Sequence, residues 1–333
     1  MIEIVDSDSG FDALRDTWNE MARDEAWNSF LWCREAWKCQ RGSLRILVWS
    51  RDAQRAIFPF FVDAKGTLRL IGDELSDGGD VVCDSKANLY WAFREAADAV
   101  SEMRDVKRVW LMKTPANSQL LAHWSAMWPQ CVVFKAPATT FLRVPETNDV
   151  VRAMPGLKRK DHGRLDAIAR FADGYSFELR TGGNFPRAEI EELRAAMRAQ
   201  GRRDADFLPD AWVVFAERLF SAGVAEVPMF FKDGAPQALA FRFRGGKAAS
   251  LRWLSWICLS RDPRLVSALY LRYIAEKAKN EAFTIDFGTG AYDYKLGTFR
   301  PQISANFTFR ASKTRLGRWC DIARMIARHR GAW

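Results

Sequence analysis

The chain has 333 residues, of which 48% are hydrophobic and 27% are charged. This composition is typical of a globular chain and excludes a disordered or fibrous protein, and the length favours two domains. No run approaches the roughly 20 apolar residues of a membrane-spanning helix, and the start, MIEIVDSDSG, does not resemble a signal peptide. The six cysteines show no CxxC spacing and only three histidines are present, so we expect reduced thiols, a cytoplasmic protein and no metal centre.

The formal charge is unevenly distributed along the chain. Residues 1–150 hold 18 Lys and Arg against 22 Asp and Glu, a net charge of −4. Residues 151–333 hold 32 against 19, a net charge of +13. The basic second half predicts a partner that carries phosphates or an acidic surface.

Hydrophobic periodicity predicts alternating helices and strands. In the first half we expect helices at 11–21, 30–41, 87–103 and 117–128, strands at 44–50, 55–64, 67–73 and 106–113, and one or two strands through 131–144. In the second half we expect helices at 150–172, 186–201, 209–222 and 265–282, and strands at 175–180, 227–233, 237–245, 247–257, 284–288 and 303–310.

Two segments share a strand, charged turn, strand, glycine turn, strand order. They are RILVWSRDAQRAIFPFFVDAKGTLRLI in the first half and VPMFFKDGAPQALAFRFRGGKAASLRWL in the second. Their identity is low, so the repeat is one of architecture. This order predicts an α/β fold built twice, with domains at 1–150 and 151–333.

The loop SRDPRLVSA begins the helix expected at 265–282. Free backbone N–H groups, the positive end of the helix dipole, and Arg261 and Arg264 together would form a pyrophosphate site. An ordinary helix start explains the same residues, with Asp262 as the N-cap and Pro263 in the first position. The loop alone favours this second interpretation.

The stretch from Thr284 to Gly297 is the most informative part of the sequence. The apolar strand TIDFG brings Asp286 to its end, and the following glycine turn, TGAYDYKLG, carries Tyr294 and Lys295. A carboxylate in this place could act as a base or orient an amine, and a tyrosine could protonate a leaving group. A glycine turn with a solvated ion pair is the alternative interpretation.

Asp286 to Gly288, followed by Tyr294-Lys295-Leu296-Gly297, resembles the DFxxG…YK…G signature of the CelD/BcsL-type acetyltransferases. The FPFF and SDGGDVV segments, the basic run LKRKDHGRL and the hairpin FFKDGAPQALAFRFRGGKA resemble other parts of that family in the same order. The resemblance covers most of the chain, but only residues 284–297 are specific. It implies two tandem GNAT-like (acyl-CoA N-acyltransferase) domains with mixed central sheets, in the FemAB-like arrangement.

The resemblance also implies a function, the transfer of an acetyl or other acyl group from acyl-CoA to an amine, or less favourably to a hydroxyl. The acceptor would be a small molecule or a glycan, in the biosynthesis of exopolysaccharide or another envelope glycan. Asp286 would orient or deprotonate the acceptor, Tyr294 would protonate the CoA thiolate, and Lys295 would bind a phosphate or the acceptor. Backbone N–H groups between Trp253 and Trp256 would hold the carbonyl oxygen. The full set expected to bind the cofactor is Trp253, Ser255, Trp256, Arg261, Arg264 and Ser267.

Two other functions stay open. FemAB-like relatives include enzymes that take aminoacyl-tRNA as donor, which the basic second half would suit. A non-catalytic scaffold within a biosynthetic complex is favoured by the absence of glycine from SRDPRLVSAL, since the superfamily loop usually reads Arg/Gln-x-x-Gly-x-Gly/Ala. The amphipathic pattern of TRLGRWCDIARMIARHR would allow peripheral contact with the inner membrane.

Overall fold

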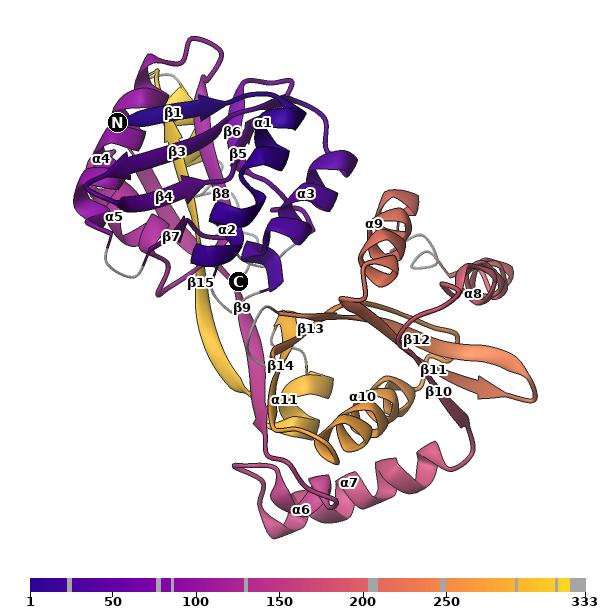
Figure 1. Cartoon of the computed structure of the whole chain (residues 1–333). Helices are drawn as coiled ribbons and strands as arrows, with labels where there is room; N and C mark the ends of the chain where they lie inside the picture. The colour runs from indigo at the N-terminus through magenta and orange to yellow at the C-terminus, as the bar shows by residue number, and fades with distance from the viewer. Residues whose placement is uncertain are drawn as a thin grey trace. The chain divides into compact units, whose positions relative to one another are not determined.

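The computed structural model describes residues 1–22, 26–75, 79–84, 87–128, 131–202, 209–245, 250–290, 293–314 and 317–323. Within these residues the chain forms two compact units (Figure 1). The N-terminal unit comprises Met1–Ala138 together with Ser304–Trp333, and the C-terminal unit comprises Thr139–Ile303. The sequence placed 151–333 in one domain. The difference arises because the last long strand pairs with a strand of the first unit.

The N-terminal unit contains helices and two sheets. Its elements are β1 (Ile2–Val5), α1 (Asp8–Ala13), α2 (Arg15–Met21), the 3₁₀ turn η1 (Ala26–Asn28), α3 (Phe30–Cys39), β2 (Ser43–Leu44), β3 (Ile46–Arg51), β4 (Gln54–Phe58), β5 (Phe60–Val62), β6 (Thr67–Leu70), β7 (Val82–Cys83), α4 (Leu89–Glu102), β8 (Arg108–Pro115), α5 (Gln119–Met127), and most of β15 (Gln302–Ser312). The strand β9 (Cys131–Val144) begins in this unit and ends in the other.

One sheet of this unit has the strand order β1-β3-β4-β7, and the other follows the order β9-β15-β8-β6-β5-β2. Strand β15 runs antiparallel to β8, and β6 runs parallel to β8. The run 55–64, expected to be one strand, is divided at Pro59, and β4 and β5 belong to different sheets. Proline has no N–H to donate to a strand partner, so it commonly marks such a break. Aromatic side chains of β4, β5, α4 and α5 fill the core of this unit.

The C-terminal unit places its helices on both faces of a sheet (Figure 1). Its elements are α6 (Val150–Ala153), α7 (Arg159–Ala172), β10 (Ser176–Arg180), α8 (Arg187–Ala199), α9 (Asp210–Ser221), β11 (Ala225–Lys232), β12 (Ala235–Arg244), β13 (Ser250–Cys258), α10 (Pro263–Ala278), β14 (Phe283–Thr289) and α11 (Asp293–Phe299). The strand order is β10-β11-β12-β13-β14-β9.

Different helices pack against the two faces of β12. Phe241 stacks on Phe185, just before α8, and Phe243 contacts Phe215 of α9. Arg242 lies over the ring of Tyr273 of α10, at 5.0 Å from the ring centroid. The sheet is therefore covered by α8 and α9 on one side and by α10 on the other.

Two elements of this unit differ from the sequence prediction. The helix expected at 150–172 is divided into α6 and α7, because Pro155 disfavours a helical conformation at Met154 and Gly156 adopts φ +78°. The turn expected after the TIDFG strand ends in the helix α11. Lys295, Thr298 and Phe299 are buried at helical spacing, and Phe299 stacks on Phe287 at 5.3 Å.

Candidate functional site

The candidate site begins where β13 and β14 part. They pair in parallel at three positions only, Ser250 with Thr284, Leu251 with Ile285 and Arg252 with Asp286. In the part of the chain that the structure describes, residues 253–258 of β13 pair with β12 alone. One edge of β13 therefore has no strand partner beyond Arg252. Backbone N–H groups on such an edge are available to donate hydrogen bonds to a ligand oxygen.

Asp286 lies at the last parallel pair before the strands part, and it is 6% exposed. Its carboxylate oxygen Oδ1 accepts a hydrogen bond from the N–H of Gly288 at 2.6 Å. Gly288 has φ +76°, a left-handed conformation that glycine adopts without steric cost. The carboxylate and the glycine together shape the turn after β14.

Lys295, on α11, holds the same turn. Its Nζ donates to the carbonyl oxygens of Phe287 at 2.7 Å, Thr289 at 3.2 Å and Gly290 at 3.2 Å. The residue is 3% exposed. The structure thus brings two of the sequence-predicted residues, Asp286 and Lys295, to one turn, where both bind backbone groups.

The first turn of α10 is already capped by its own residues. The N–H of Asp262 donates to Ser260 Oγ at 3.0 Å, and the N–H of Arg264 donates to Asp262 Oδ1 at 2.9 Å. The N–H of Leu265 donates to the Asp262 carbonyl at 3.1 Å, and Pro263 has no N–H. The described turn therefore leaves no backbone donor free for a pyrophosphate, as the cap interpretation of this loop expected.

The two arginines of this loop differ. Arg264 pairs with Asp262 at 2.6 Å and lies over the ring of Phe171 at 4.7 Å. Its hydrogen bond lowers the pKa of Asp262, so that carboxyl is ionised at neutral pH and holds the charge of Arg264 in an ion pair. Arg261 is exposed and makes no ion pair with any described residue. Only Arg261 is therefore available as a cation.

Of the other predicted site residues, one is buried and the rest are described only by their backbone. Ser267 lies in α10 and is 3% exposed, so its hydroxyl is not presented to solvent. The backbone of Trp253, Ser255 and Trp256 belongs to β13, but their side chains lie outside what the structure describes, as does that of Tyr294.

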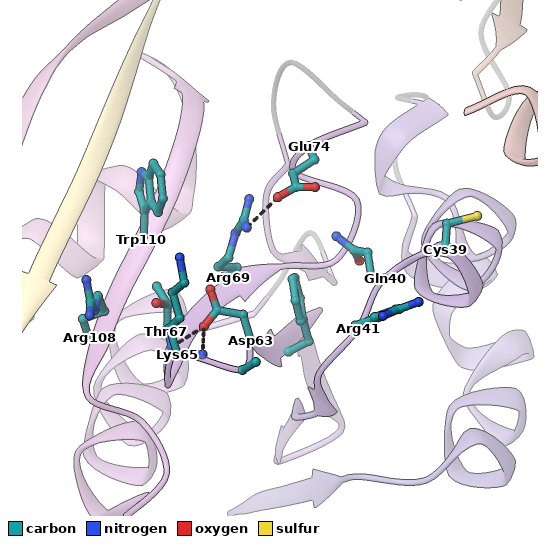
Figure 2. Close-up of a pocket in the computed structure, with 12 residues that line it drawn as sticks. Cys39, Gln40, Arg41, Asp63, Lys65, Thr67, Arg69, Glu74, Arg108 and Trp110 are labelled. Carbon is teal, nitrogen blue, oxygen red and sulfur yellow. Dashed lines mark hydrogen bonds and ion pairs between the residues drawn. The ribbon is translucent and has the colours of Figure 1, made fainter. Parts of the chain in front are cut away.

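The sequence reasoning missed a cavity of about 580 Å³ in the N-terminal unit (Figure 2). It is lined by Cys39, Gln40, Arg41, Phe61, Asp63, Ala64, Lys65, Thr67, Arg69, Glu74, Arg108 and Trp110. These residues come from three separated segments, so no local motif marks them. Within the middle segment, Phe61, Lys65 and Arg69 recur at every fourth position, which is a weak signal by itself.

Comparison with solved structures defines the fold class. The chain is similar to FemX (12% identity, 93% of this chain and 97% of that chain, TM-score 0.61). It is similar to the C-terminal domain of a putative lysylphosphatidylglycerol synthetase from Agrobacterium fabrum (16%, 95% and 95%, 0.58). It is also similar to a tandem GNAT protein from the clavulanic acid biosynthesis pathway (12%, 94% and 98%, 0.54).

No family model and no curated protein sequence matches the chain. The structural likenesses confirm the predicted fold, two tandem GNAT-like units, over nearly the whole chain. The resemblance to the CelD/BcsL family in particular stays a prediction. Among the described residues no helix has both the length and the apolar character needed to cross a membrane.

Proposed function

We propose that this protein is an acyltransferase that moves an activated acyl group to an amine acceptor in its C-terminal unit. The observation that carries the proposal is the open edge of β13 beyond Arg252, next to the buried turn held by Asp286 and Lys295. Fixed backbone N–H groups on such an edge stabilise the oxygen of a carbonyl that becomes tetrahedral.

The reaction needs few side chains. The acceptor nitrogen forms a bond to the acyl carbon, the bond from that carbon to the leaving oxygen or sulfur breaks, and one proton passes from nitrogen to the leaving atom. Tyr294 is the residue we propose as the proton donor. We assign Asp286 and Lys295 to positioning, because both are buried and each already binds backbone groups of the turn.

The donor we favour is an aminoacyl-tRNA rather than an acyl-CoA. The expected pyrophosphate site does not fit that group, since the donors of the first turn of α10 are bonded and Arg264 is already paired with Asp262. A polyanion would instead be held by the C-terminal unit, in which 26 Lys and Arg outnumber 20 Asp and Glu, a net charge of +6. The C-terminal domain of the putative lysylphosphatidylglycerol synthetase has a similar fold, and its name points to a product in which a lysyl group is joined to a lipid headgroup.

Direct transfer assays test the proposal. The purified full chain is incubated with a pool of labelled aminoacyl-tRNAs, or with labelled acetyl-CoA, and with a panel of amines, muropeptides and amino sugars. We expect transfer from the tRNA pool that RNase abolishes. Transfer from acetyl-CoA, weakened in Arg261→Ala, would restore the acyl-CoA donor. If neither donor reacts with any acceptor, the protein is a scaffold with an acyltransferase fold.

A further inference from the structure

The cavity of the N-terminal unit has two walls and a charged centre (Figure 2). Gln40 and Arg41 follow α3 on one wall, and Arg108 and Trp110 of β8 lie on the other. Arg69 of β6 lies between them. Its volume of about 580 Å³ is in the range of small-molecule sites, roughly 300–1,000 Å³.

Arg69 belongs to the frame of the cavity. Its guanidinium binds both oxygens of Asp73 at 2.9 and 3.0 Å and reaches Glu74 at 2.7 Å. It also lies 5.4 Å from the ring centroid of Trp110 and 5.9 Å from that of Phe61. Because these acids neutralise it and the rings confine it, Arg69 fixes the shape of the cavity and leaves little charge for a ligand.

Three other cations of the lining are free. Within the described part of the chain, Arg41, Lys65 and Arg108 pair with no carboxylate. The nearest acid in the hairpin, Asp63, binds the backbone N–H groups of Lys65 at 2.8 Å and Thr67 at 2.9 Å through Oδ1. The lining as a whole contains four cations and two carboxylates, Asp63 and Glu74, so it keeps an excess of two positive charges, which favours an anionic ligand.

Two residues of the lining, Gln40 and Trp110, also carry buried neutral donors without acceptors among the described residues. Gln40 Oε1 accepts the N–H of Gly72 at 3.1 Å, which orients the amide. Its Nε2 is buried and has no partner among the described residues, and the same holds for Nε1 of Trp110. A buried donor left unpaired is unfavourable, and such groups in folded proteins usually have a partner. An oxygen-rich ligand would supply one.

We propose that this cavity binds the phosphate group of a small phosphorylated molecule. A phosphate offers two negative charges and several acceptor oxygens, which match two arginines, one lysine and the donors of Gln40 and Trp110. A single carboxylate would leave part of the charge and of the donors unmatched. The proposal concerns the N-terminal unit alone and does not depend on acyl transfer.

Calorimetry with the full chain tests this site, with inorganic phosphate, pyrophosphate and glycerol 3-phosphate as probes. We expect saturable binding, weakened about tenfold or more in Arg41→Gln/Arg108→Gln, which corresponds to about 1.4 kcal/mol. Both residues lack ion partners, so the variant should fold normally. Arg104→Gln removes an exposed arginine that does not line the cavity, and it should bind as the wild type does.

Gln40→Glu provides a second test at the neutral donor. The substitution keeps an acceptor for the N–H of Gly72 but removes the Nε2 donor and adds a negative charge, so binding should weaken by a similar factor. A phosphate group can belong to a free small molecule or to a lipid headgroup, and sedimentation with vesicles that contain phosphatidic acid distinguishes the two. If the wild type binds these vesicles and Arg41→Gln/Arg108→Gln does not, the ligand is a lipid headgroup. The proposal is overturned if no probe binds at millimolar concentration, or if the double variant and Gln40→Glu bind like the Arg104→Gln control.

Discussion

Asp286 and Lys295 hold one short turn through its opposite polar groups. The Asp286 carboxylate accepts the N–H of Gly288 at 2.6 Å, and the Lys295 ammonium donates to the carbonyls of Phe287, Thr289 and Gly290. The turn lies directly after the last parallel pair of β13 and β14. Any ligand at the open edge of β13 therefore meets a backbone whose position these two buried charges determine.

Lys295→Met should lower the free energy of unfolding by roughly 2–3 kcal/mol, because three carbonyl groups lose a charged donor in a buried place. Urea unfolding with an unchanged m-value measures this. Lys279→Met removes a half-exposed lysine that pairs with Glu276 on the surface and should cost at most about 0.5 kcal/mol. If Lys295→Met is as stable as Lys279→Met yet inactive, Lys295 acts in chemistry and not in positioning.

Gly288→Ala should destabilise the protein by about 1–2 kcal/mol, since φ +76° is strained for a residue with a Cβ. Gly297→Ala is the matched control in the next element. Gly297 lies in α11, and an added Cβ there would meet nothing nearer than Arg164 Nη1 at 4.0 Å. Alanine in a helix should then be neutral or gain up to about 1 kcal/mol. Thermal unfolding compares the two, and equal melting temperatures would refute the strained turn.

Burial raises the pKa of Asp73 to about 7, against 3.8 for an unperturbed carboxyl, in spite of the Arg69 guanidinium beside it. Between about pH 4 and 7 the native state then binds more protons at Asp73 than the unfolded state does. The stability of the wild type relative to Asp73→Asn should therefore fall as the pH rises from 5 to about 7. Urea unfolding of both proteins across this range measures the difference. A difference that stays constant, or grows with pH, would mean that Asp73 is ionised throughout.

The cysteines should differ sharply in reactivity. Burial raises the pKa of the Cys33 thiol to about 12, whereas Cys320 is exposed. The thiolate is the reactive form, so an aromatic disulfide reagent at neutral pH should modify Cys320 rapidly and leave Cys33 unmodified until the protein unfolds. Cys320→Ser should remove the fast phase, and Cys33→Ser should leave it unchanged. A fast phase that depends on Cys33 would show that the core of the N-terminal unit opens readily.

The sequence located the turn at 286–297 but not the role of its residues. The apolar strand and the glycines can be read from local pattern, and Asp286 and Lys295 are candidates because they are titratable and match the DFxxG…YK…G signature. Both side chains bind backbone groups because they are buried. A buried charged group needs hydrogen-bond partners, and the N–H and carbonyl groups of the turn supply them. The glycine at 297 weakened the helical pattern of α11, and only the packing of Phe299 on Phe287 and Tyr270 reveals its buried face.

Local sequence patterns predict neither the partners of a strand nor the cavity. The pattern at 303–310 predicted a strand correctly, but nothing in it indicates pairing with β8, which is some 190 residues earlier in the chain. The division at Pro59 was readable in principle, because proline rarely lies within a paired strand. The cavity combines Gln40, Arg69 and Arg108 from three segments, and only the folded chain brings them together.

The central claim is that the open edge of β13 receives the acyl group. Hydrogen–deuterium exchange of the backbone amides at 253–258 tests it directly, with a short acceptor-stem RNA carrying an amide-linked amino acid, which cannot react, and with acetyl-CoA. We predict slower exchange in this segment and in the turn 287–290 when the RNA is bound. Protection confined to other segments, or none with either donor, would contradict the claim.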